Sequence, residues 1–73
     1  MTEEQLADLK NFKVRVTLTN QVKNISLVVE LGIVEKFYGG GLQWTIGLPF
    51  EAVLKKLISR KFKIKKIKVL DNI

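Results

Sequence analysis

The alternation of apolar and polar residues is most regular near the start of the chain, over residues 13–19. Val14, Val16 and Leu18 fall on one side of an extended chain, and lysine, arginine and threonine side chains fall on the other. A period of two is typical of a strand with one buried side. We therefore predict a strand here, followed by a turn at NQVKN, residues 20–24.

Residues 25–38, ISLVVELGIVEKFY, are rich in β-branched residues, and Gly32 in their middle disfavours a helix. We predict one long strand that bends at Gly32 through a bulge or kink. The side expected to be buried has apolar residues at alternate positions: Ile25, Leu27, Val29, Leu31 and Ile33. Ser26, Glu30 and Lys36 are expected on the opposite side.

The glycine run in YGGGL, residues 38–42, predicts a hairpin turn, because glycine adopts positive φ without strain. The next segment, residues 42–48 (LQWTIGL), predicts a third strand. Its inner side would carry Leu42, Trp44, Ile46 and Leu48. Three strands joined by short loops form an antiparallel meander.

Two segments have helical signals. Thr2 followed by Gln5 forms a capping-box pattern, which predicts a short helix over residues 3–10, the alternative being a frayed chain end. Pro49 marks the start of a second helix, over residues 50–60. Its apolar residues recur at helical spacing: Phe50, Val53, Leu54, Leu57 and Ile58.

The last segment, residues 61–69, alternates but changes phase at Lys65 and Lys66. A strand with a bulge at this point would turn four apolar residues to the core side: Phe62, Ile64, Ile67 and Val69. The alternative is that the helix continues through residue 68. The β-branched content favours the strand.

These elements predict a single α+β domain, residues 1–73, with the order α-β-β-β-α-β. A three- to four-stranded antiparallel sheet would pack against one or two helices. A chain of this length buries only about 60% of the surface that it exposes when unfolded. We therefore expect either a tight core or a partner, such as a homodimer formed through a sheet edge or the 50–58 helix.

The net charge of +6 is unevenly placed. Residues 1–54 carry five basic and six acidic side chains, whereas residues 55–73 carry eight basic side chains and one acidic one. The last quarter of the chain therefore has a net charge of +7. Such asymmetry bears on the choice of partner and not on the fold.

Composition disfavours catalysis. The chain contains no histidine and no cysteine, which removes the usual general base, the thiolate nucleophile and the commonest transition-metal ligands. The glycines at 39–41 lack the lysine and the following helix of a phosphate-binding loop. We expect no enzyme activity, no catalytic or metal-binding residue, no cofactor and no small-molecule substrate. No apolar run reaches the roughly 18 residues that span a bilayer, so we expect a cytoplasmic protein.

The basic segment indicates a small domain that binds nucleic acid non-specifically, through backbone phosphates. Lysines at alternate positions of a strand stand about 6.6 Å apart, close to the spacing of phosphates along one nucleic-acid strand. Tyr38 is the expected exposed ring for base stacking, and Lys13 and Arg15 would join if their strand lies nearby. The predicted basic contacts are Lys56, Arg60, Lys61, Lys63, Lys65, Lys66 and Lys68.

Two other readings of the same lysines stay open. The protein is alternatively an interaction module (an inhibitor, adaptor or small subunit) that docks the basic segment on an acidic protein. Lysines on an edge strand also serve simply to prevent edge-to-edge aggregation.

Two families share features with the chain. The order α-β-β-β-α resembles that of double-stranded-RNA-binding domains, but LPFEAV, residues 48–53, stands where that family has basic residues at the start of its second helix. LQWTIGLPFEAVLKKLI, residues 42–58, is similar to the strand and helix of single-strand-binding coactivator domains. That resemblance implies dimerisation through the helix and binding through basic strands. It covers about a quarter of the chain, which departs from the family plan by continuing into a further strand.

Overall fold

The structure, a computed structural model, describes residues 7 and 9–72. The predicted capping box and most of the helix predicted over residues 3–10 lie outside the described residues. Within them, residues 7 and 9–11 are helical. The other helix, α2 (Phe50–Ser59), confirms the helix predicted over residues 50–60. No helix in the described part of the chain is long and apolar enough to cross a membrane.

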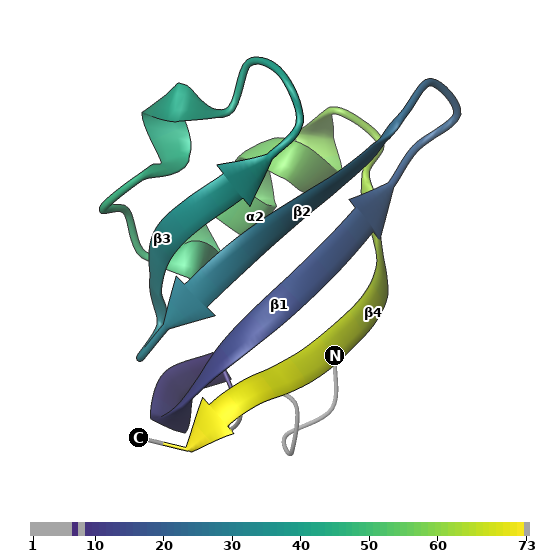
Figure 1. Ribbon diagram of the computed structural model, residues 1–73. Helices are drawn as coiled ribbons and strands as arrows, with labels where there is room; N and C mark the ends of the chain where they lie inside the picture. The colour runs from purple at the N-terminus through teal and green to yellow at the C-terminus, as the bar shows by residue number, and fades with distance from the viewer. Residues whose placement is uncertain (1–6, 8, 73) are drawn as a thin grey trace.

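Four antiparallel strands form one sheet in the order β3-β2-β1-β4. Their bounds are β1 (Phe12–Thr19), β2 (Asn24–Glu30), β3 (Ile33–Tyr38) and β4 (Lys63–Asn72). Figure 1 shows α2 behind the sheet and the opposite face, toward the viewer, free of other described elements. The α+β class, with an antiparallel sheet packed against helices, is as predicted.

The core lies between the sheet and α2. Val14, Val16 and Leu18 of β1 are fully buried, which confirms the side predicted for them. They belong to the same cluster as Phe50 and Leu57 of α2. The period of two in β1 and the helical period in α2 therefore bring two apolar surfaces together.

The long strand predicted over residues 25–38 is wrong, because the chain reverses completely at its centre. Leu31 and Gly32 have φ of 51° and 84°, and the residues on either side of them, Glu30 and Ile33, are paired across β2 and β3. Two successive residues with positive φ form the tight turn that suits the twist of a hairpin. Leu31 and Ile33, which were expected in the core, are exposed, and Val34 is buried instead.

The strand predicted over residues 42–48 is also wrong. The short helix η1 (Gln43–Thr45) and a turn take its place, so that the third strand of the meander is β3. Thr45 is fully buried, and its hydroxyl donates a hydrogen bond of 2.6 Å to the carbonyl oxygen of Leu42. Ile46 and Leu48 are exposed. The element order is the predicted one, but its second and third strands are the two halves of residues 25–38.

The bulge predicted in the last strand is confirmed. Thr17 pairs with Lys66 and the next residue, Leu18, pairs with Ile64, so Lys65 is the extra residue of β4. Ile64 and Ile67 pack against the core from their half-buried positions. The alternative, a helix continuing through residue 68, is wrong.

Three of the four apolar residues assigned to the inner side of this segment contact the core, since Phe62 is buried as well. Val69 is more open than expected and remains 44% exposed. A second register shift, between Lys13 and Val14, lies close to it along the sheet.

Candidate nucleic-acid interface

The face of the sheet that no other described element covers, called here the uncovered face, is organised in rows that cross the strands. Residues paired on neighbouring strands point to the same side, so the register identifies which side chains share this face. One row, in sheet order, is Lys36, Val28, Arg15 and Lys68. The next row is Tyr38, Ser26, Thr17 and Lys66. Beyond it, Asn24, Thr19 and Lys63 form a third row.

These rows bring five basic side chains onto one face, and we call them the basic face: Arg15, Lys36, Lys63, Lys66 and Lys68. They come from β1, β3 and β4, so residues far apart in the sequence contribute to one surface. The central position of β1, between β2 and β4, is what places Arg15 beside the lysines of β4.

Arg15 is held in a defined position across the sheet. The guanidinium carbon of Arg15 lies 4.8 Å from the centre of the Tyr38 ring, within the range of a cation–π contact. Because Arg15 is on β1 and Tyr38 on β3, the arginine side chain passes over β2. Val28, its partner on β2, is only 4% exposed although it lies on the uncovered face. The aliphatic stem of Arg15 therefore covers Val28, and the charged end lies against Tyr38.

Acidic side chains gather at one end of this face, around Lys13. Lys13 Nζ lies 3.5 Å from Glu35 Oε2, and Glu30 is the register partner of Lys13 on β2. The other ion pair among the described side chains joins Lys10 to Glu51 at 3.8 Å. Among the described side chains, no member of the basic face is in an ion pair. Lys13 therefore adds little net charge, whereas the basic face keeps its own.

The sequence-predicted residues divide into groups. Lys63, Lys66 and Lys68 lie on the basic face with Tyr38, and Lys65 is exposed at the bulge beside them. By contrast, Lys56 and Arg60 lie on the helix side of the sheet. Their charged ends are 5.2 and 5.4 Å from the centre of the Trp44 ring. One flat ligand on the basic face cannot reach this second group.

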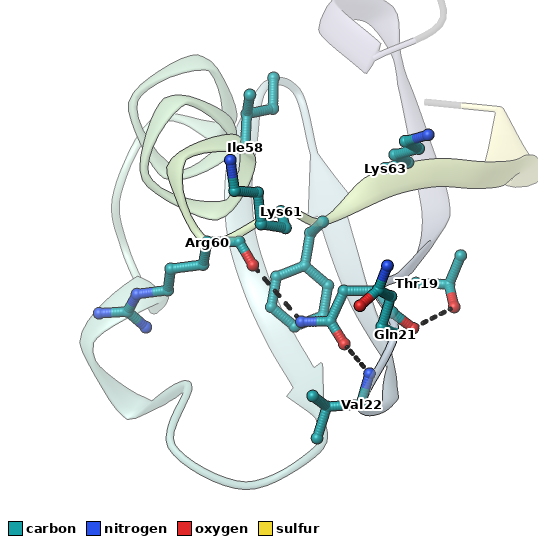
Figure 2. A pocket seen from close by; sticks show the side chains of 9 residues that line it. Thr19, Gln21, Val22, Ile58, Arg60, Lys61 and Lys63 are labelled. Carbon is teal, nitrogen blue, oxygen red and sulfur yellow. Dashed lines mark hydrogen bonds between the residues drawn. The ribbon is translucent and has the colours of Figure 1, made fainter.

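Lys61 lies at the junction between α2 and β4, beside an open groove of about 730 Å³ (Figure 2). Asn20 connects the two sides of the groove. Its side-chain oxygen accepts hydrogen bonds of 2.8 Å from the backbone N–H groups of Val22 and Lys23, and its amide donates one of 3.5 Å to the carbonyl oxygen of Arg60. In Figure 2 the guanidinium of Arg60 points away from the other lining side chains. The groove does not gather its three cations around one point, and we assign no ligand to it.

Sequence reasoning did not assign Lys36, Ser26 or Thr17 to the interface. The alternation of apolar and polar residues did place Ser26 and Lys36 on the polar side of their strands. This was the one sign in the sequence that they face solvent. What the pattern lacked was the register, and the register alone shows that these residues share a face with the lysines of β4.

The fold also bears on the family resemblances. The similarity to single-strand-binding coactivator domains rested on a strand that leads directly into a helix, and residues 42–48 form η1 and a turn instead. Comparisons of the chain with protein-family models, with curated proteins and with solved structures found no match.

Proposed function

We propose that the protein binds nucleic acid non-specifically through backbone phosphates, using the basic face. The observation that carries this proposal is the register between β1 and β4, which sets Arg15 opposite Lys68 and Thr17 opposite Lys66. Among the described residues, no other element covers this surface and none of its five basic side chains is in an ion pair. A solvated strand edge would account for lysines along β4. It would also account for Lys36, because β3 is the other edge strand, but it would not account for Arg15, which lies on the inner strand β1.

The spacing of the charges suits a phosphate backbone. Lys66 and Lys68 are two residues apart on one strand, a separation of about 6.6 Å. Directly opposite residues have Cβ atoms about 5 Å apart, so the side chain of Arg15 starts beside that of Lys68, and its guanidinium extends over β2 to Tyr38. Four of the five cations are lysines, which bind phosphates as point charges and do not read base edges in a bidentate way. Binding should therefore depend strongly on salt and weakly on sequence.

Replacing Lys63, Lys66 and Lys68 together with alanine should weaken binding to oligonucleotides, because phosphate contacts and the release of counterions would be lost. The slope of log K against log[salt] should become shallower by roughly 0.7–0.9 per contact removed, or about two to three units in total. Fluorescence anisotropy with a labelled oligonucleotide, repeated across a range of salt concentrations, measures this slope.

The matched control replaces Lys23, Lys55 and Lys56 with alanine. This variant also loses three positive charges, but from exposed positions outside the basic face. It should keep most of the salt slope. An equal loss in both variants would mean that net charge, and not the basic face, drives binding. Equal affinity for polyglutamate and for an oligonucleotide would instead favour docking on an acidic protein.

A further inference from the structure

The row that contains Tyr38 has a chemical order of its own. From β3 to β4 it presents an aromatic ring, two hydroxyl groups and an ammonium group: Tyr38, Ser26, Thr17 and Lys66. The hydroxyl oxygens of Ser26 and Thr17 lie 3.4 Å apart, so they form one polar patch in the middle of the row. The row spans three strand spacings, about 14 Å at the backbone. This order corresponds to base, sugar and phosphate in one nucleotide.

The Tyr38 ring is available to a base. It is on the uncovered face and is 48% exposed, although Arg15 already lies against it. A ring held by a guanidinium loses little freedom when a ligand stacks on its open part. Bases stack on aromatic rings and on arginine planes without regard to sequence, which agrees with the non-specific contact proposed above.

A duplex would leave the aromatic ring of this row without a base to stack on. Its bases are stacked inside the helix, and their edges are reached only by an element that enters a groove. The described elements of this face are strands lying in the plane of the sheet, and none of them projects from it (Figure 1). A duplex could contact the lysines and the hydroxyl groups through its phosphates and sugars, but its paired bases would not stack on Tyr38.

Resting on the proposed function, we infer that the ligand of the basic face is a single strand. Its phosphates follow Lys63, Lys66 and Lys68 along β4, its sugars lie over β1 and β2, and one unpaired base stacks on Tyr38. DNA and RNA single strands share this chemistry.

The test compares four labelled oligonucleotides of equal phosphate number at one salt concentration: a DNA single strand, an RNA single strand, a DNA duplex and a DNA strand with abasic sites. At least one natural single strand should bind about 10-fold or more tightly than the duplex. The abasic strand should bind roughly 5- to 100-fold more weakly than its natural counterpart, since it keeps the phosphates and lacks the stacking base.

Two variants locate the effect. Tyr38→Leu should abolish the difference between natural and abasic strands, and Tyr38→Phe should keep it, because the ring and not the hydroxyl is needed. Equal loss in both variants, equal binding of the abasic strand, or preference for the duplex would overturn the single-strand inference. The proposed function would stand in these cases if the lysine variant still bound more weakly. Absence of binding to all four oligonucleotides would overturn both.

Discussion

Replacing Phe50 with alanine is expected to lower the free energy of unfolding by about 3–5 kcal/mol. Phe50 is the first residue of α2 and is only 1% exposed. It belongs to the hydrophobic cluster between the helix and the sheet. A domain of this size is expected to have a total stability of about 4–11 kcal/mol, at roughly 0.05–0.15 kcal/mol per residue. The change should therefore remove much of the stability. Urea denaturation followed by circular dichroism measures it.

Ile58→Ala is the matched control, in the same helix. Ile58 is 56% exposed, so its replacement should change the free energy of unfolding by no more than about 0.5 kcal/mol. If the two variants lost similar amounts, α2 would not pack on the sheet through the side described above.

Gly39→Ala is expected to lower the free energy of unfolding by about 2–6 kcal/mol, through two effects of about 1–3 kcal/mol each. The first is backbone strain, because Gly39 has a φ of +127°, which residues with a side chain rarely adopt. The second is overpacking, because a Cβ atom at Gly39 would lie 2.8 Å from Cγ2 of Ile25. Ile25 is 1% exposed and has little room to move away. Thermal or urea denaturation measures the loss.

The neighbouring Gly40 offers the control for this substitution. A Cβ atom at Gly40 would meet no atom within 4 Å, and its φ is outside the left-handed range. Gly40→Ala should therefore change the stability by about 0.5 kcal/mol or less. A Gly39→Ala variant as stable as the Gly40→Ala variant would contradict the close contact between this loop and β2.

The sequence pattern identified an element correctly where one side of that element is buried and the other is exposed. The alternation in β1, the helical spacing in α2 and the change of phase at Lys65 each reflect a boundary between core and solvent. Burial on one side forces a period on the chain, and a bulge appears as a break in that period.

The pattern failed where the backbone turns without an interruption in composition. Leu31 and Ile33 continue the apolar alternation through the two-residue turn at 31–32, so a reversal looked like a bend. In residues 42–48 the apolar spacing of two coincides with a helical turn that buries Thr45. The positive φ of Leu31 and the burial of Thr45 both depend on contacts with other segments of the chain. A local sequence pattern contains no information about such contacts.

The same division applies to the candidate interface. The amino-acid sequence by itself determined that positive charge is concentrated in the last quarter of the chain, that histidine and cysteine chemistry is absent, and which side of β1 is polar. Only the tertiary structure decided which charges act together. Pairing of β4 with β1 set Lys66 and Lys68 beside Thr17 and Arg15, and the reversal at Gly32 brought Tyr38 within reach of Arg15. The physical reason is that the side on which a charge lies follows from the local period, whereas its neighbours follow from strand register, and register is set by the packing of the whole core.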